Sequence, residues 1–299
     1  MSATHARKKP FLRLATAAVA MVAALGMAAC SGGAATSSSS SGAQVGDRTP
    51  EQIQESGEIV IGIFSDKAPF GYIDADGKPA GYDVVYGDRI AADLGVTAKY
   101  VPVDAAARTE VLASNKVDIT LANFTVTPER AEKVDFANPY FKVSLGVVSP
   151  TSAEITDVSQ LAGKTLIVTK GTTAEAYFEA NHPEVKLLKF DQYSDAYQAL
   201  EDGRGDAFST DNTEVIAWAI AHPGFSVGIK SLGDTSYIAA AVKKGNTALL
   251  DWLNNQLVEL GEEDFFHKDY EQTLAPVYGD AATPDDLVVE GSQDTTSTN

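Results

Sequence analysis

The chain has 299 residues, and its 23 Lys and Arg against 41 Asp and Glu give a formal net charge of −18. At about 150 residues per domain this length allows two compact units, and the acidic balance argues against nucleic-acid binding, which requires a basic surface. A single cysteine excludes a disulfide framework and a cysteine-based zinc site.

The N-terminal segment has the pattern of an export signal. Its positive charges are Arg7, Lys8, Lys9 and Arg13. The uncharged residues 14–29 follow, a stretch shorter than the roughly 20 residues of a membrane-spanning helix. Small residues then precede Cys30, which resembles a lipobox whose cysteine is lipidated, although Met27 stands where Leu is usual. We predict a lipoprotein signal peptide over residues 1–29 and lipidation at Cys30, with a plain secretory signal as the alternative.

Small polar residues flank the central part of the chain. Residues 31–48 are rich in Gly, Ser and Ala, and such a segment buries too little apolar surface to offset the entropy of ordering. This predicts a flexible tether over residues 30–56. The equally polar residues 281–299 are predicted to form a C-terminal tail. Without residues 1–29 the chain keeps 19 basic and 41 acidic residues, a net charge of −22, which favours solubility.

Strand and helix patterns alternate between these flanking segments. The predicted strands are 58–64, 98–102, 117–123, 166–169, 186–190 and 206–210. The predicted helices are 83–94, 108–114, 172–181, 194–202, 212–221 and 249–260. Such alternation is typical of parallel sheets covered by helices on both faces. A weak echo between residues 115–118 and 203–206 indicates two related α/β lobes, and open sheets of this kind bind ligands in the crevice beyond the carboxyl ends of their strands.

The most informative motif is the octapeptide NFTVTPER, residues 123–130. Thr127 and Pro128 have the residue types of an N-cap and a first helical residue, which places Arg130 in the first turn of a helix. A cation there opposes the helix dipole at a cost of about 0.3–1 kcal/mol. An arginine that binds a carboxylate through two charge-assisted bonds offsets this cost, whereas a surface salt bridge is the structural alternative.

Two other strand-to-helix junctions, and two basic residues, supply further candidates. Thr172 and Thr173 lie at a helix start, where free backbone N–H groups favour anions, although one of them is also needed as a cap. Asp211 is either an N-cap or an acceptor for a ligand ammonium. Arg108 lies near a helix start, and Lys67 lies in the turn after the first strand. Each is either a solvated surface group or a binding residue.

Patterns for metal binding and nucleophilic catalysis are absent from the sequence. The four histidines have no ligand spacing with one another, and there is no Gly-x-Ser-x-Gly elbow. We therefore predict no metal, no cofactor and no enzymatic activity.

Five motifs in a fixed order carry a resemblance to a known family. They are GYDV at 81–84, NFTVTPER at 123–130, VDFANPY at 134–140, KGTT at 170–173 and GDA at 205–207 before Asp211. Over residues 58–280 the chain resembles the extracytoplasmic solute-binding proteins for polar amino acids that serve ABC importers (family 3), and among them the cysteine-binding members.

The resemblance implies an α/β, periplasmic-binding-protein-like fold of type II. In this fold each of two lobes is a mixed sheet flanked by helices, and two hinge strands join the lobes. On this sequence it implies lobe 1 over residues 57–145 and 240–280 and lobe 2 over residues 148–237, with hinge strands near 142–148 and 237–242.

The resemblance also implies a ligand site. Arg130 would hold the α-carboxylate of an amino acid, and Asp211 would accept its α-ammonium. The other ligand-binding candidates are Thr125, Thr173, Asn123, Arg108, Lys67, Phe124 and Thr172. Relatives often have Asn where Ala107 stands, and cysteine-binding members have His where Thr210 stands. Glutamate, aspartate, glutamine and cystine therefore stay open beside cysteine.

The expected protein is a monomeric, extracytoplasmic lipoprotein held at the membrane by its lipid. It would deliver its amino acid to an ABC permease with ATPase subunits. A surface adhesin or antigen without a transport role is one alternative. A dehydratase or lyase on the same fold is another. It would need a general acid in the cleft, and Asp211 is the only good carboxylate candidate for that role.

Overall fold

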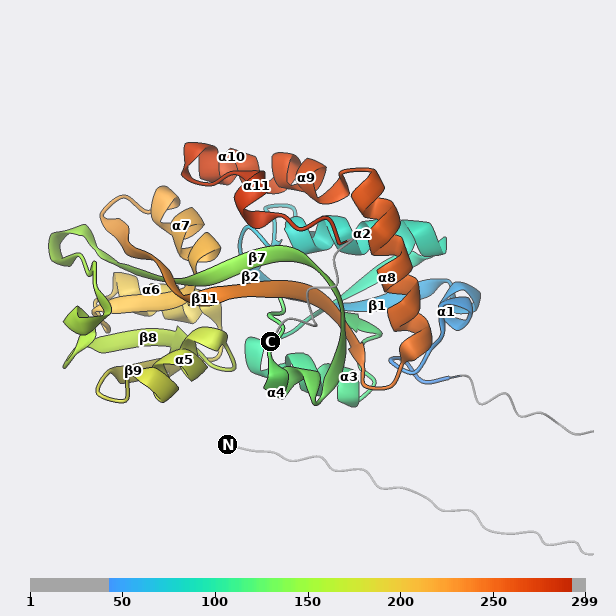
Figure 1. The fold of residues 1–299 in the computed structure, drawn as a ribbon, viewed down its shortest axis with the longest axis horizontal. Helices are drawn as coiled ribbons and strands as arrows, with labels where there is room; N and C mark the ends of the chain where they lie inside the picture. Colours follow the sequence, from blue (N-terminus) through green and yellow to red (C-terminus); the bar gives the residue numbers. More distant parts are fainter. Residues whose placement is uncertain (1–42, 292–299) are drawn as a thin grey trace, which may run out of the picture. The chain divides into compact units, whose positions relative to one another are not determined.

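The computed structural model describes residues 43–291 (Figure 1). The predicted signal peptide and the predicted lipidation site at Cys30 lie outside the described residues. Among the described residues, none of the helices has the length and apolar character needed to span a membrane.

A mixed sheet of eight strands forms the centre of the described chain. Its strands, in spatial order, are β5 (Thr97–Pro102), β1 (Glu58–Ile63), β6 (Ile119–Thr120), β11 (Phe225–Lys243), β7 (Val134–Pro150), β10 (Ala207–Asp211), β8 (Thr165–Thr169) and β9 (Lys186–Phe190). The pairs β5–β1–β6 are parallel, as are β10–β8–β9. These parallel sets are what the alternation of strands and helices predicts.

Two long strands join the two parallel sets. β7 has 17 residues and β11 has 19, and they pair antiparallel from Val134↔Lys243 to Phe225↔Pro150. In Figure 1 they run side by side through the middle of the molecule. The predicted hinge segments lie within them. Because β11 pairs with β6 of the first set and β7 pairs with β10 of the second, the strands form one continuous order. Register shifts between Val227 and Ala241 bend the pairing of β7 with β11.

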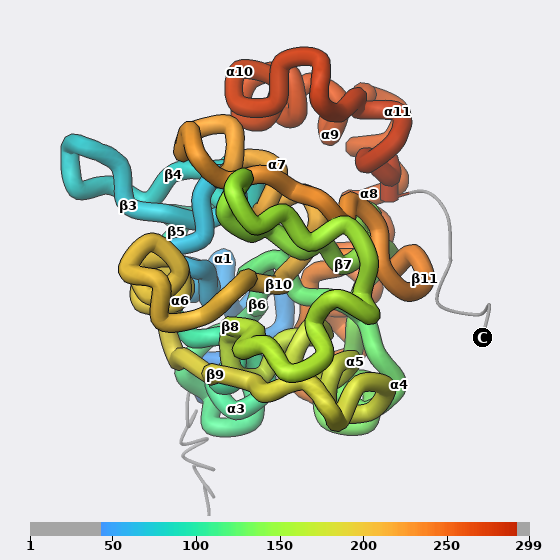
Figure 2. The backbone as a smooth tube through the Cα atoms, turned by 90° about the vertical axis from the view of Figure 1, so that its left-hand side faces the viewer, coloured from blue at the N-terminus to red at the C-terminus, as the bar shows by residue number. Residues whose placement is uncertain are grey.

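A second, smaller sheet follows β1. It contains β2 (Asp66–Lys67), β3 (Gly71–Ile73) and β4 (Pro79–Ala80), paired antiparallel. Figure 2 shows the β3–β4 hairpin extending away from the strands of the large sheet. Because β2 directly follows the carboxyl end of β1, Lys67 is delivered to that edge of the large sheet.

Helices flank the sheet, and side chains cap the starts of some of them. They are α1 (Pro50–Ser56), α2 (Tyr82–Leu94), α3 (Arg108–Ala113), α4 (Pro128–Ala131), α5 (Thr173–Asn181), α6 (Tyr193–Glu201), α7 (Asn212–Ala221), α8 (Thr247–Glu262), α9 (Phe265–Asp269), α10 (Ala275–Tyr278) and α11 (Pro284–Leu287). Thr127 caps α4 by accepting a bond from the Arg130 N–H, and Pro128 is its first residue. Gly95 ends α2 in the left-handed conformation.

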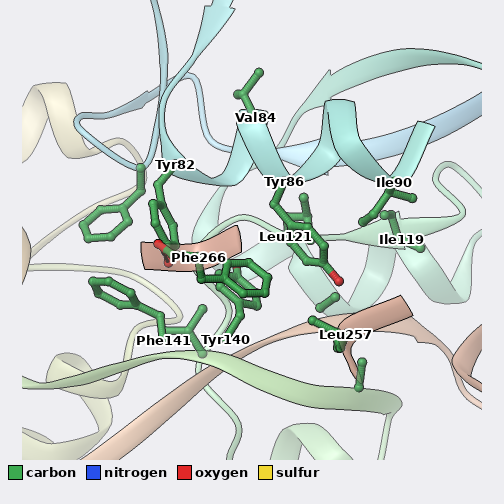
Figure 3. Packing of buried hydrophobic residues seen from close by; sticks show 14 of the residues in the cluster. Tyr82, Val84, Tyr86, Ile90, Ile119, Leu121, Tyr140, Phe141, Leu257 and Phe266 are labelled. Atoms are coloured by element: carbon green, nitrogen blue, oxygen red, sulfur yellow. Dashed lines mark hydrogen bonds between the residues drawn. The ribbon is translucent and has the colours of Figure 1, made fainter. Parts of the chain in front are cut away.

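An aromatic core packs α2 and α9 against β7. Figure 3 shows the rings of Tyr82, Tyr86, Tyr140, Phe141 and Phe266 gathered between these elements. Their centroids lie 5.0–6.2 Å apart in tilted, stacked and edge-on pairs, the separations at which aromatic pairs stabilise a core. The aromatic core therefore holds the helices of the first parallel set to the strand that joins both sets.

The predicted flanking segments are shorter than expected. Residues 43–56 do not belong to a tether, because Arg48 is buried in a salt bridge with Asp118 and α1 buries Ile53. Residues 281–291 do not form a polar tail, because α11 and Val288 pack against β7. A few apolar side chains in a polar stretch are enough to anchor it, and composition averages hide them.

Candidate ligand-binding site

A strained turn after β6 presents the residues of the NFTVTPER motif. Ala122 and Asn123 both have left-handed backbone angles, with φ near +41° and +42°, a conformation that non-glycine residues adopt at a cost and mostly at functional sites. The Asp83 carboxylate holds the turn by accepting bonds from the Asn123 N–H at 2.6 Å and the Tyr140 hydroxyl at 2.7 Å. Burial raises the pKa of Asp83 to about 6, against the effect of these bonds.

Arg108 is a buried residue of this site, not a surface group. Its side chain is 3% exposed. Nη1 donates to the carbonyls of Ala122 and Asn123 at 3.1 Å each, and Nη2 donates to the carbonyl of Gly171 at 3.2 Å. The guanidinium also lies 4.5 Å from the centre of the Phe124 ring. Arg108 therefore supports the strained turn and reaches across to the end of β8.

Arg130, in the first turn of α4, also donates to the Gly171 carbonyl. Its Nη1 donates to the carbonyl of Thr125 at 2.7 Å and its Nη2 to that of Gly171 at 2.9 Å. The guanidinium lies 5.1 Å from the centre of the Phe124 ring. Burial, with the charge of Arg108 as a second cause, lowers the pKa of Arg130 to about 9.

The two guanidiniums have no anionic partner in the described chain. Within residues 43–291 neither Arg108 nor Arg130 forms a salt bridge, and a nearby carboxylate in the sequence, Asp135, pairs with Lys244. Their side-chain bonds go to backbone carbonyls. A buried and a half-buried cation without an anion favour the binding of one.

The loop between β8 and α5 forms the opposite wall. Thr172 caps α5 by accepting a bond from the Glu175 N–H at 3.2 Å, and it donates to the Thr169 carbonyl at 2.7 Å. Gly171 has φ near +73°, and a Cβ there would lie 2.4 Å from the Cα of Ala106. Only glycine allows this close approach between the two walls.

A buried cluster of opposite charges lies at the end of β10. The Lys67 Nζ lies 2.8 Å from Asp211 Oδ2 and 3.0 Å from Glu214 Oε2, and it donates to the Tyr193 hydroxyl at 3.2 Å. Lys67, Asp211 and Glu214 are 1%, 5% and 1% exposed. Burial lowers the pKa of Lys67, but the two carboxylates outweigh it, so that the pKa is raised well above its usual range. Burial raises the pKa of Glu214 to about 7, with Lys67 opposing.

A pocket of about 130 Å³ opens beside this cluster. It is lined by Val143, Ser144, Leu145, Thr173, Tyr177, Asp211, Leu232, Gly233, Asp234 and Ser236. Its walls therefore come from the two long strands β7 and β11, from the start of α5 and from the end of β10. Asp211 and Thr173 are the predicted site residues that face this space.

Several buried polar atoms near the site have no hydrogen-bond partner among the described residues. They include both amide atoms of the Asn123 side chain, the Thr169 hydroxyl and Glu214 Oε1. Buried polar groups are nearly always bonded, so these atoms have hydrogen-bonding capacity that a polar ligand or water can use. In the described range there is no group of three or more His, Cys, Asp or Glu that could hold a metal ion.

The predicted site residues thus come together, but in arrangements that the sequence does not reveal. Arg108, Arg130, Asn123, Phe124 and Thr125 form one wall, Thr172 and Thr173 the other, and Lys67 joins Asp211. Asp83, Tyr193 and Glu214 were not predicted. Glu214 left a signal, because it is the one charged residue in the apolar helix 212–221, where a lone charge is expected to be paired.

Comparison with known proteins identifies the family. The family model for bacterial extracellular solute-binding proteins, family 3, matches residues 59–274, and the chain belongs to this family. The resemblance of the sequence motifs and the periplasmic-binding-protein-like fold are thereby confirmed.

Three relatives show the range of similarity. The solute receptor for L-cysteine of Neisseria gonorrhoeae is 51% identical, with a TM-score of 0.80, over 81% of this chain and 100% of the receptor. The cysteine-binding protein of Campylobacter jejuni is 50% identical, with a TM-score of 0.79, over 80% and 98%. The ABC transporter glutamine-binding protein GlnH of Bacillus subtilis is 28% identical over 86% and 95%. All three are described as receptors or binding proteins, and none as an enzyme.

Proposed function

We propose that this protein captures a zwitterionic amino acid, with cysteine as the first ligand to test, and delivers it to an ABC import permease. Two relatives with about half of their residues identical are described as receptors for cysteine. Glutamine follows from the more distant relative, and cystine, glutamate and aspartate stay open because Lys67 and Arg108 are cations close to the site.

The pair of guanidiniums, of the buried Arg108 and the half-buried Arg130, is the observation that carries this proposal. Arg130 and Arg108 meet at the Gly171 carbonyl without an anionic partner in the described chain. The ligand carboxylate takes this position, and Arg130 binds it. Thr125 and the backbone around Asn123 and Thr173, apart from the Asn123 N–H that Asp83 accepts, add hydrogen bonds. The Phe124 ring lies against both guanidiniums.

Asp211 provides the opposite charge for the ammonium. It lines the 130 Å³ pocket, and Lys67 engages its Oδ2 atom. Its Oδ1 atom accepts no hydrogen bond from residues 43–291, so it is available to a ligand. Charged hydrogen bonds contribute about 1.5–3 kcal/mol each.

Recognition of both ends of the ligand connects binding to closure. We assign lobe 1 to residues 57–145 and 240–280, and lobe 2 to residues 148–237. Arg130 belongs to the first lobe and Asp211 to the second. A ligand that bonds to both stabilises only the closed arrangement and shifts the population toward it. The closed form is the one that the permease recognises.

The anchor is the second part of the proposal. A lipid on Cys30 and the small polar residues after it hold the binding domain near the membrane. Tethering raises the effective concentration of the domain at the permease. This part is tested by mass spectrometry of the membrane fraction, which detects a lipid on Cys30 in the natural chain and none in Cys30→Ser.

Substitution of Arg130 tests the binding function. We expect Arg130→Ala to lose most of the affinity for cysteine in calorimetry while its far-UV circular dichroism stays native. Arg204→Ala is the matched control, because Arg204 also lies over a phenylalanine ring, that of Phe190 at 5.1 Å, but is exposed. Thermal-shift screening of the twenty amino acids and cystine identifies the ligand, since stabilisation depends on concentration relative to the dissociation constant. Equal affinity in Arg130→Ala overturns the assignment, and no binding by the natural chain favours a non-transport role.

A further inference from the structure

We infer that Asp66 is a positioning residue that raises the affinity for the ligand without touching it. Its carboxylate supplies the N-terminal cap of α6 from the other lobe, so that this cap forms only where the two lobes meet. With the lobes assigned above, Asp66 belongs to lobe 1 and α6 to lobe 2. The inference rests on the proposed function for the ligand and for closure, and its tests distinguish the two.

The sequence at the start of α6 provides no cap of its own. The N-cap position is Gln192, whose side chain accepts no bond from the helix, and glutamine is not among the residues that favour this position. Helix α5 of the same lobe, by contrast, is capped by its own Thr172, which accepts a bond from the Glu175 N–H at 3.2 Å. The first four N–H groups of a helix have no partner within it, so those at the start of α6 require acceptors from elsewhere.

Asp66 provides such an acceptor from a distant part of the chain. Its Oδ2 atom accepts a bond from the Ser194 N–H at 3.2 Å and another from the Ser194 hydroxyl at 3.4 Å. These are the contacts of a capping side chain, except that 128 residues separate the two partners. A carboxylate at this end of a helix also interacts favourably with the helix dipole.

The two residues before Ser194 contact lobe 1 as well. The Gln192 side chain donates through Nε2 to Asp104 Oδ1, so it is engaged in this pair and does not cap α6. The Tyr193 ring packs edge-on against Phe64, with 5.3 Å between the ring centres. The start of α6 is therefore a contact surface between the lobes, and Asp66 satisfies the helix end within it.

Asp66 lies apart from the groups proposed to contact the ligand. It is half-buried and Ser194 is exposed, and neither residue lines the 130 Å³ pocket. A substitution at Asp66 therefore removes no ligand contact. Ligand binding stabilises the arrangement in which the lobes meet, so a bond that forms between the lobes in that arrangement adds to the free energy of closure and to the observed affinity.

Calorimetry with cysteine on the full chain tests the role in affinity. We expect Asp66→Ala to bind cysteine about fivefold more weakly than the natural protein, the typical effect of losing one helix cap. Asp66→Asn stays close to the natural affinity, because asparagine caps a helix about as well as aspartate. Asp74→Ala is the matched control with unchanged affinity, because Asp74 is also half-buried but accepts its backbone bonds from Asp76 and Lys78 of its own hairpin.

The outcomes of this titration separate the cap from the proposed function. Equal affinity in Asp66→Ala and the natural protein overturns the cap alone. An equal loss in Asp66→Ala and Asp66→Asn also overturns it, because the charge of Asp66 and not its capping bond would then set the affinity. If the natural protein binds no amino acid, the proposed function is overturned, and the role of Asp66 in affinity is overturned with it.

Amide hydrogen exchange at Ser194 tests the capping bond itself. Among the described residues the acceptor of this N–H is Asp66, so the exchange rate reports the bond directly. We expect saturating cysteine to slow this exchange about fivefold in the natural protein and in Asp66→Asn, and to leave it unchanged in Asp66→Ala. Exchange that is equally slow in the natural protein without cysteine would show a cap that does not depend on closure, and would overturn the inference.

Thermal unfolding distinguishes this positioning role from a structural one. Without cysteine, we expect Asp66→Ala and the natural protein to unfold at the same temperature, because the lobes need not meet. At one fixed cysteine concentration, the stabilisation of Asp66→Ala is smaller, as its weaker binding requires. A lower unfolding temperature of Asp66→Ala without cysteine would show that Asp66 stabilises its own lobe, and would overturn the inference.

Discussion

Two buried sites of ion pairing, Arg48 with Asp118 and Lys67 with Asp211 and Glu214, connect distant parts of the described chain, and they differ in how completely their acceptors are used. Asp118 accepts bonds from the Gly46 N–H at 3.0 Å, the Val60 N–H at 2.8 Å and the Nε and Nη2 groups of Arg48. In the cluster around Lys67, by contrast, Asp211 lines a pocket and Glu214 Oε1 has no partner in the described chain.

The difference teaches how to separate a structural ion pair from one that is open to a ligand. A carboxylate whose acceptor positions are all filled by its own chain has nothing to offer a ligand, and removal of either partner leaves a buried charge uncompensated. A carboxylate with a free oxygen beside a cavity keeps that capacity. The Arg48–Asp118 pair anchors the start of the folded chain, whereas the Lys67 cluster lies where two walls meet.

The largest expected effect is on stability at the saturated pair. Asp118→Ala leaves the Arg48 guanidinium buried and two backbone N–H groups without an acceptor, so we expect the free energy of unfolding to fall by about 3–5 kcal/mol. Urea unfolding followed by circular dichroism measures this change. The affinity of the folded protein for cysteine stays the same. A change below about 1 kcal/mol would contradict the structural role.

For Asp211→Asn we expect the reverse, a change in affinity with little change in stability. We expect cysteine binding to weaken by about ten- to a hundredfold, as the loss of a charged hydrogen bond of about 1.5–3 kcal/mol implies. The stability changes little, because Lys67 keeps Glu214 at 3.0 Å. Asp191→Asn is the control, since Asp191 forms an exposed pair with Lys170. A variant that loses stability but binds normally would place Asp211 with the structural pairs.

Local elements of the fold could be predicted closely from the sequence. The strand 186–190 and the helix 212–221 have the predicted bounds, and Thr127 caps its helix as expected. The strand predicted over 117–123 is reduced to Ile119–Thr120. Its apolar pattern continues, but Asp83 holds the chain in left-handed angles at Ala122 and Asn123, and a contact 40 residues away leaves no local pattern.

The candidate site could be predicted residue by residue but not as pairs. Arg130 and Asp211 followed from their positions at helix starts and from family motifs. The partner of Asp211 is 144 residues away at Lys67, and the partner of Arg48 is 70 residues away. Such pairs depend on how the two parallel sets of strands meet, which is set by the long strands β7 and β11. The motifs therefore identify the groups, whereas the tertiary structure decides which group each one faces.

Asp269 is a third kind of buried carboxyl group, one without a cation. It is 2% exposed, its Oδ1 accepts from the Thr273 hydroxyl at 3.1 Å, and its Oδ2 has no partner among residues 43–291. Burial raises its pKa from the usual 3.8 to about 9, with Asp83 adding to the effect. Asp269 is therefore protonated at neutral pH and avoids the cost of an unpaired buried charge.

Replacement of Asp269 by asparagine has the smallest expected effect, and it has the opposite sign. Between about pH 4 and pH 9 the Asp269 carboxyl group is protonated in the folded chain and ionised in the unfolded chain. The contribution of Asp269 to the free energy of unfolding is therefore largest at low pH and falls as the pH rises. Linkage sets a limit of about 1.36 kcal/mol per pH unit, and the two amide donors of Asn, which need acceptors, reduce the gain. We expect Asp269→Asn to be roughly 1–2 kcal/mol more stable than the natural protein at pH 7 and equal to it near pH 4. Urea unfolding at both pH values measures this, and a variant less stable at pH 7 would show that the carboxylate of Asp269 is charged and paired.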